Sequence, residues 1–172
     1  MIKIGDIGKI LTGNTPKTSE TENYNSDDIC FVKPSDIPEN NISYINDSEF
    51  YISETARSKA RILPTQSVLV TCIGIIGKVA INQVECAFNQ QINAIIPDLK
   101  KCLPNYLAYA IQYRKEQMQD IANAAVVPIL NKTQFSNIEI NLPSLDKQHE
   151  TITVLCKIGK LISLRKQQLT KL

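Results

Sequence analysis

Polar side chains that could bind a nucleic acid recur in turns and at the ends of the predicted strands. Lysine and arginine neutralise phosphates and pair with guanine, whereas asparagine and glutamine pair with adenine in the major groove. The residues of this kind are Asn14, Thr15, Lys17, Lys33, Ser35, Arg57, Lys59, Arg61, Lys78, Asn89 and Gln90. Together they predict contacts with double-stranded DNA, although each residue taken singly could be a solvated loop residue or a turn former.

The most concentrated basic segment is Arg57-Ser58-Lys59-Ala60-Arg61. Alternate residues of an extended chain point to the same side. We therefore expect this segment to be extended, with its three positive charges on one side.

No complete catalytic set accompanies these residues. The segment Gly74-Ile75-Ile76-Gly77-Lys78 has two residues between its glycines and Val79 after the lysine, whereas a phosphate-binding loop has four residues there and Ser or Thr after the lysine. We expect a turn between strands that exposes Lys78.

Motifs of other enzymes are also incomplete. The motif Asp98-x-Lys100 lacks a second acid for a nuclease metal site. Neither the nucleophile motif G-x-S-x-G nor the cofactor-binding motif G-x-G-x-x-G occurs. The sequence thus predicts neither catalysis nor a bound metal or cofactor, and a stand-alone enzyme is only the second of two alternatives.

Net charge does not mark the chain as a DNA-binding protein. The formal charge of +2 combines a segment from Asp146 onward, with six Lys/Arg and two Asp/Glu, and a preceding body with 13 basic and 15 acidic residues. If the body binds DNA, its basic groups must gather on one face.

The five cysteines are odd in number and form no C-x-x-C pair, which argues against a disulfide framework or a zinc site. We expect most of them to be buried. No leader and no run of 18 apolar residues occurs, so we expect a cytoplasmic protein without a membrane span.

Runs of β-branched residues bounded by glycine or proline predict most of the body. Strands are expected at residues 29–32, 67–73, 78–81, 92–96 and 138–142, a strand or short helix at 2–11, and a strand or irregular loop at 40–53. Apolar residues at helical spacing follow Pro104 and extend to Ile121. The fold class that these elements predict is α+β, with a mixed α/β domain at residues 1–143.

Residues 144–172 predict one long helix after this domain, with Ser144 as its cap and Asp146 in its first turn. Six residues, hereafter the seam, follow the alternating steps of three and four of a coiled coil. The seam consists of Leu155, Ile158, Ile162, Arg165, Leu169 and Leu172. Such a helix runs roughly 40 Å, too long for a small domain to cover. We expect it to protrude and to pair with a second copy, and a helix docked on its own core is the alternative.

Six phrases, taken in order, resemble a known family. They are Gly13-Asn14-Thr15-Pro16, Lys33-Pro34-Ser35-Asp36-Ile37, Leu63-Pro64 with Ser67-Val68-Leu69-Val70, Gly77-Lys78-Val79-Ala80, Asn89-Gln90-Gln91, and Leu142-Pro143-Ser144-Leu145-Asp146-Lys147-Gln148. The ordered set is similar to the target-recognition domain and conserved helix of type I restriction-modification DNA specificity subunits. The resemblance spans nearly the whole chain.

This resemblance implies a non-catalytic DNA reader. Full-length members of the family carry two recognition domains separated by two long antiparallel helices, and each domain reads half of a split site. One domain and one helix resemble a half subunit, which implies a homodimer that reads an interrupted palindrome. The implied partners are a methyltransferase subunit, which binds S-adenosylmethionine, and a restriction subunit. The alternative is a truncated interaction module, or decoy, that binds the methyltransferase without reading DNA.

Overall fold

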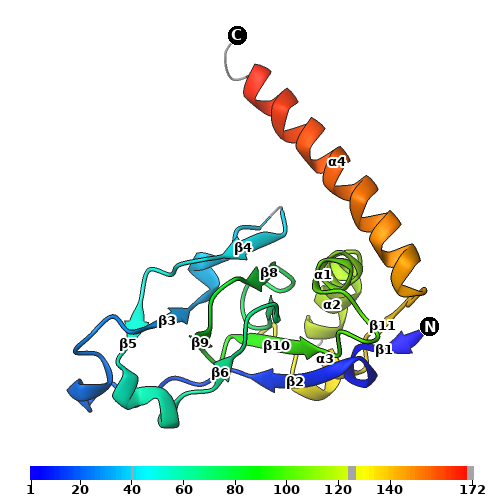
Figure 1. The fold of residues 1–172 in the computed structure, drawn as a ribbon. Coiled ribbons are helices and arrows are strands. Elements are labelled where there is room, and N and C mark those ends of the chain that lie inside the picture. The colour runs from blue at the N-terminus through cyan, green and yellow to red at the C-terminus, as the bar shows by residue number, and fades with distance from the viewer. Residues whose placement is uncertain (40, 124–126, 170–172) are drawn as a thin grey trace.

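The computed structural model describes residues 1–39, 41–123 and 127–169, and shows a mixed α/β body followed by a long helix (Figure 1). The α-helices are α1 (Pro104–Gln112), α2 (Lys115–Ala122), α3 (Lys132–Ser136) and α4 (Leu145–Leu169). The 3-10 helices are η1 (Ile4–Asp6), η2 (Thr21–Asn23), η3 (Pro34–Asp36) and η4 (Glu54–Lys59). The mixed α/β class predicted from the sequence is confirmed.

The larger sheet has the strand order β2-β10-β7-β8-β4. Its strands are β2 (Gly8–Thr12), β10 (Ile92–Pro97), β7 (Val68–Thr71), β8 (Val79–Asn82) and β4 (Ser43–Ile45). All neighbours are antiparallel except β4, which runs parallel to β8. The pairing of β7 with β8 confirms the prediction from their β-branched residues. In the turn between them, Gly74 and Gly77 have φ angles of +75° and +85°, a conformation that favours glycine.

The smaller sheet has the strand order β5-β3-β9-β6. Its strands are β5 (Tyr51–Ile52), β3 (Ile29–Val32), β9 (Cys86–Phe88) and β6 (Ile62–Leu63). A two-stranded sheet pairs β1 (Ile2–Lys3) with β11 (Glu139–Ile140). Because β3 and β9 run parallel, the polar segments that follow them emerge at the same edge of the smaller sheet.

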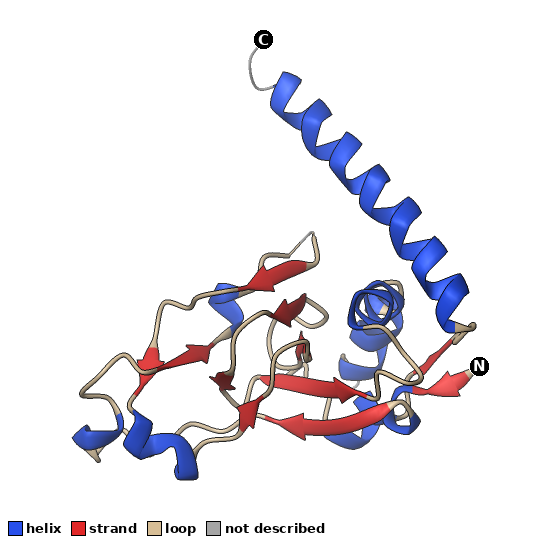
Figure 2. Cartoon of the chain, in the orientation of Figure 1, coloured by secondary structure: helices blue, strands red, loops and turns tan. Residues whose placement is uncertain are grey.

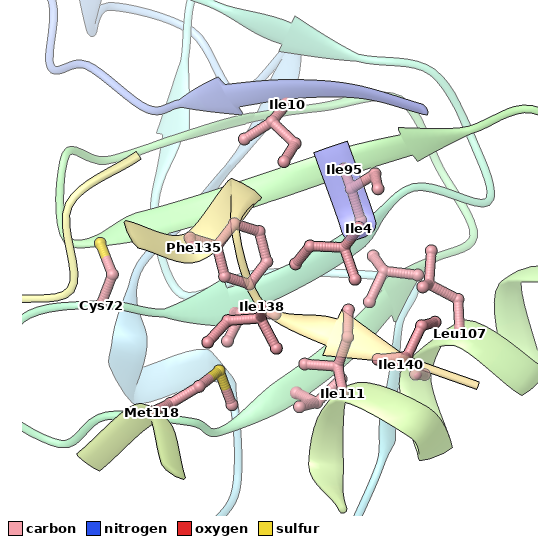
Figure 3. Close-up of a cluster of buried hydrophobic side chains, with 14 of the residues drawn as sticks. Ile4, Ile10, Cys72, Ile95, Leu107, Ile111, Met118, Phe135, Ile138 and Ile140 are labelled. Atoms are coloured by element: carbon pink, nitrogen blue, oxygen red, sulfur yellow. The ribbon is translucent and has the colours of Figure 1, made fainter. Parts of the chain in front are cut away.

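The main core lies between the larger sheet and the short helices. Figure 3 shows Leu107 and Ile111 of α1, Met118 of α2 and Phe135 of α3 in one cluster with Ile4. All five side chains are fully buried. Burying an aliphatic or aromatic side chain of this size stabilises the fold by about 1.5–3 kcal/mol, so these contacts hold the helices against the sheet.

A second cluster joins the two sheets. Val32 and Phe88, at the carboxyl ends of β3 and β9, pack with Leu69 and Ile92 of the larger sheet, and all four side chains are fully buried. The edge at which β3 and β9 end is therefore fixed relative to the larger sheet.

The helical spacing that follows Pro104 is found in two helices, with Tyr113 and Arg114 between them. Arg114 has φ −93° and ψ 11°, outside the helical region. The apolar spacing continues across this break, from Ile111 to Met118, and neither glycine nor proline marks it. Periodicity alone could not reveal the interruption.

Helix α4 extends away from the body (Figures 1 and 2). Its 25 residues span about 38 Å at 1.5 Å per residue. Gln148, in its first turn, is fully buried: its Nε2 donates to the carbonyls of Lys101 and Pro143, and its Oε1 accepts from the backbone N–H of Leu103, each at 2.9 Å. These three hydrogen bonds fix the direction in which α4 leaves the body. Leu172, the last residue of the seam, lies outside the described residues.

Three of the five cysteines, Cys72, Cys86 and Cys102, are buried, which confirms the prediction that most are. Burial raises the pKa of each of these thiols to about 12.

Within the described ranges, no helix is both long and apolar enough to cross a bilayer. The same ranges contain no group of three His, Cys, Asp or Glu residues that could hold a metal ion.

Candidate nucleic-acid interface

Three polar loops meet where β2, β3 and β9 end, and we call this surface the loop junction. Its three loops are residues 13–17, 33–36 and 89–91. It also includes residues 57–61, which are the end of η4 and the two residues that follow it. The backbone N–H of Asn14 donates to the carbonyl of Phe88 at 3.0 Å, and that of Asn89 donates to the carbonyl of Val32 at 3.1 Å. In Figure 1 the arrow of β2 points toward this junction and away from α4. The structure thus gathers residues that are far apart in the sequence.

Gly13 allows the first loop to approach the third. A Cβ atom at this position would lie 2.1 Å from the carbonyl oxygen of Asn89 and 2.4 Å from that of Phe88. Both obstacles are backbone atoms, which cannot move aside as a flexible side chain can. Glycine is therefore required here for close approach of the two loops.

Asn14 connects the first loop to the basic segment. Its Nδ2 donates to the carbonyl of Lys59 at 2.7 Å, and its Oδ1 accepts from the backbone N–H of Arg61 at 2.8 Å. Both ends of the amide are thus occupied by backbone groups. In this arrangement Asn14 positions the loops of the junction.

Replacing Asn14 by alanine should lower the free energy of unfolding by about 1–2 kcal/mol, because two backbone groups lose their partner. Urea denaturation followed by circular dichroism measures this change. The neighbouring Thr15→Ala removes one exposed hydrogen bond, from Oγ1 to Oε1 of Gln90 at 2.7 Å, and should cost less. Equal stability of Asn14→Ala and the wild type would show that the bridge does not hold the junction.

The basic segment does not have the extended conformation that we expected. Residues 54–59 form η4, so the prediction of an extended segment with its charges on one side is wrong. Arg57 pairs with Glu54 and Glu85, and its pKa is raised by the hydrogen bond with Glu54 and then by that with Glu85. Acidic residues outside the segment, one three residues before Arg57 and one far along the sequence, thus neutralise much of its charge. The alternation of basic and small residues describes only the segment itself, so it could not predict the ion pairs with Glu54 and Glu85.

Lys59 has a similar environment. Its Nζ lies 2.9 Å from a carboxylate oxygen of Glu20 and 3.6 Å from one of Glu22. The hydrogen bond between Lys59 and Glu20 raises the pKa of the lysine and lowers that of the glutamate. Both groups therefore remain charged at neutral pH, and the lysine is oriented toward the acidic loop.

Lys78 lies in a different place from the one predicted. We expected the turn at residues 74–77 to expose it, but only 9% of its surface is accessible. It lies beneath η3, and its Nζ donates to the carbonyl of Pro34 at 3.1 Å. The prediction of exposure is wrong because η3, 44 residues earlier in the sequence, lies against the lysine, and the residue types of the turn do not reveal this long-range contact.

The turn above Lys78 is η3, and side chains at its two ends hold it in place. The backbone N–H of Lys33 donates to Oδ2 of Asp36 at 2.7 Å, and Nζ of Lys33 lies 3.0 Å from the centre of the Phe50 ring. A lysine ammonium at this position is attracted by the face of the ring. Ser35, between them, remains exposed.

The eleven predicted DNA-binding residues differ in how far their side chains are exposed to solvent. Thr15, Lys17, Ser35, Lys59, Arg61 and Gln90 are exposed, Asn14, Lys33 and Arg57 are half-buried, and Lys78 and Asn89 are buried. Asn89 is occupied internally, since its Nδ2 donates to Oε1 of Gln91 at 2.9 Å. The sequence reasoning missed the acidic partners Glu20, Glu54 and Glu85, for which no periodicity or motif gives a signal.

The chain matches a described protein family over its full length. The family "Type I restriction modification DNA specificity domain" matches residues 1–172. The type I restriction enzyme MjaIX specificity subunit of Methanocaldococcus jannaschii is 33% identical over 170 residues, which cover 96% of this chain and 39% of that protein. The HindI specificity subunit of Haemophilus influenzae is 33% identical over 147 residues, covering 84% of this chain and 32% of that protein. The chain thus spans about two fifths or less of the length of these relatives.

Solved structures share the fold. The HsdS subunit of Thermoanaerobacter tengcongensis superimposes with a TM-score of 0.77 at 18% identity, covering 97% of this chain and 38% of that one. The S subunit of a type I restriction-modification system from M. genitalium superimposes with a TM-score of 0.68 at 12% identity, covering 99% of this chain and 41% of that one. At these identities the likeness concerns the arrangement of strands and helices.

Proposed function

This chain belongs to the family of type I restriction-modification DNA specificity domains, and from that membership we propose that it reads a DNA sequence for a modification methyltransferase. Its role is to bind DNA and to direct methyltransferase and restriction subunits to the site, and it catalyses no step itself. S-adenosylmethionine is held by the methyltransferase subunit. The protein works on DNA in the cytoplasm.

The loop junction carries this proposal. It presents side chains of three loops on one rigid edge, and loops on a rigid scaffold are the usual carriers of binding residues. Thr15, Ser35 and Gln90 are exposed and can exchange hydrogen bonds with base edges. Lys17 and Arg61 are exposed and can neutralise phosphates, so the affinity for DNA should fall as salt concentration rises.

The remaining predicted residues have supporting roles in this proposal. Asn14, Lys78 and Asn89 hold the three loops in place through the hydrogen bonds described above. Lys33, Arg57 and Lys59 lie on the flanks of the junction, where their interactions with Phe50 and the glutamates orient them. Phosphate contacts by these three residues would compete with those interactions.

Residues 1–143 form the recognition domain in this proposal, and residues 144–172 form a coiled-coil helix through which two copies pair. The exposed aliphatic side chains in the second half of α4 support such pairing. A twofold homodimer reads the same half site twice, so its target is an interrupted palindrome.

Mapping of methylated bases tests this function. The chain is expressed with its methyltransferase subunit, and genomic methylation is read by single-molecule sequencing. We expect one recurrent interrupted palindrome to be methylated and the mark to disappear when the chain is omitted. The double variant Thr15→Ala/Gln90→Ala should change or abolish the motif, whereas Thr133→Ala, exposed on α3, should preserve it. Binding of the methyltransferase without any sequence-specific mark would instead identify the chain as a decoy.

A further inference from the structure

Lys59, at the edge of the loop junction, has its charge engaged within the chain. Its Nζ donates to Oε2 of Glu20 and to Oδ1 of Asn23, each at 2.9 Å, and a carboxylate oxygen of Glu22 lies 3.6 Å away. Asn23 is fully buried, so it anchors the lysine to the interior of the chain. A lysine ammonium has three N–H donors and no acceptor. A phosphate that binds Lys59 must therefore compete with these three side chains.

The acidic partners lie on a segment that is fixed to the junction. The acidic loop, residues 20–28, contains four Asp/Glu and no Lys/Arg. The hydroxyl of Tyr24 donates to the carbonyl of Pro16, in the first loop of the junction, at 2.6 Å. Oγ1 of Thr55, in η4, donates to the carbonyl of Glu22 at 2.7 Å, and η2 and η4 lie side by side in Figure 1. The carboxylates of the acidic loop thus keep a fixed position beside the loops that are proposed to read DNA.

Lys17, on the same surface, is held far less firmly than Lys59. The exposed fraction of the side chain is 80% for Lys17 and 40% for Lys59. The carboxylate contact of Lys17 is with Glu20 at 3.8 Å, beyond hydrogen-bond distance. Exposed ion pairs of this kind contribute little, so Lys17 can turn toward a phosphate at little cost. Lys59 would have to give up two hydrogen bonds, and the phosphate would approach two carboxylates of like charge.

We propose that Glu20 and Glu22 limit the affinity of the loop junction for DNA of any sequence. They withhold Lys59 from phosphates and place two negative charges beside the junction. This inference rests on the DNA-reading function proposed above and adds to it a control of affinity at the same surface. Phosphate contacts supply nearly all of the binding to DNA that lacks the target sequence. With one contact fewer, the protein leaves such DNA sooner.

Binding of the full chain to a short duplex of random sequence, followed by fluorescence anisotropy at several salt concentrations, tests this proposal. The double variant Glu20→Gln/Glu22→Gln keeps the shape of both side chains and removes their charges. It should raise the affinity at least about threefold. It should also steepen the fall of the logarithm of the binding constant with the logarithm of the salt concentration by about 0.9, the value for one additional phosphate contact.

Glu139→Gln/Glu150→Gln is the control of equal net charge. Both glutamates are exposed, and they lie on β11 and in the first turns of α4, at the end of the body away from the junction (Figure 1). Glu150 also holds a lysine, since its carboxylate lies 2.7 Å from Nζ of Lys147. The control therefore releases one lysine outside the junction and should leave the salt dependence of DNA binding unchanged.

The substitution Lys59→Ala determines whether the gain in affinity depends on this lysine. In the wild type it should leave the salt dependence unchanged, because Lys59 is held by the acidic loop. In the Glu20→Gln/Glu22→Gln background it should return the salt dependence to the wild-type value. A purely structural role of Lys59 would alter the stability measured in urea without this return.

The outcomes separate this inference from the function on which it rests. A Glu20→Gln/Glu22→Gln protein that binds the duplex as the wild type does would overturn the proposal, as would a steeper salt dependence that persists after Lys59→Ala. Either result leaves the DNA-reading function standing. A wild-type chain that binds no duplex, and that leaves no sequence-specific mark with its methyltransferase, would overturn the function and the inference together. Circular dichroism verifies that each variant is folded.

Discussion

The double substitution Ile158→Asp/Ile162→Asp should convert the proposed dimer into monomers in sedimentation experiments. Each isoleucine is already about half covered by its own chain, so the dimer interface adds about half of the roughly 1.5–3 kcal/mol of full burial, and a twofold dimer loses four such contributions. Carboxylates placed against an apolar surface add a desolvation cost. We therefore expect the dissociation constant to rise by more than roughly a thousandfold.

The variant should still fold, because Ile158 and Ile162 are about half exposed within a single chain, at 47% and 52%. Thr153→Asp is the matched control: it adds a carboxylate at an exposed position of α4 that helical spacing places roughly opposite these two isoleucines. This control should remain dimeric. If Ile158→Asp/Ile162→Asp also remained dimeric, the copies would have to pair through another surface.

Loss of the dimer should also remove the function. A monomer presents one recognition domain and cannot read both halves of an interrupted palindrome. Co-expression of the double variant with the methyltransferase should therefore leave the palindrome unmethylated. Retention of that methylation by a monomer would contradict the twofold reading of the site.

Substitution of Gly13 by valine should lower the free energy of unfolding by at least about 3 kcal/mol. A Cβ at this position lies 2.1 Å from the carbonyl oxygen of Asn89, so β2 and the loop after β9 must separate. That separation breaks the hydrogen bonds from the backbone N–H of Gly13 to Ile92 and from that of Asn14 to Phe88, each 3.0 Å long. Thermal and urea denaturation measure the loss of stability.

Gly159→Ala is the control for this substitution, because a Cβ at Gly159 meets no atom within 4 Å. It should stabilise α4 by about 0.5–1 kcal/mol, since alanine is the better helix former. A Gly13→Val protein as stable as the wild type would show that the loop junction can open without cost. Reduced methylation by the Gly13 variant under conditions where it remains folded would link the junction geometry to DNA recognition.

The local elements could be predicted from the sequence because their signals are short in range. β-branched runs between turn residues predicted β3, β7, β8 and β10, and all four are present. The ordered phrases from Gly13 to Gln148 predicted the family, and the match over residues 1–172 confirms it. Helical spacing and the Ser144-Leu145-Asp146 start predicted α4, which begins at Leu145.

The environment of the polar residues was decided only by tertiary structure, because their partners lie far away in the sequence. Lys78 is buried beneath a turn 44 residues before it, and Lys59 pairs with Glu20, 39 residues away. Gln148 fixes the direction of α4 through a loop 45 to 47 residues earlier. Periodicity and residue type determine which face of a helix or strand is apolar, but only the packing of distant elements determines which charges are neutralised and which remain available to DNA.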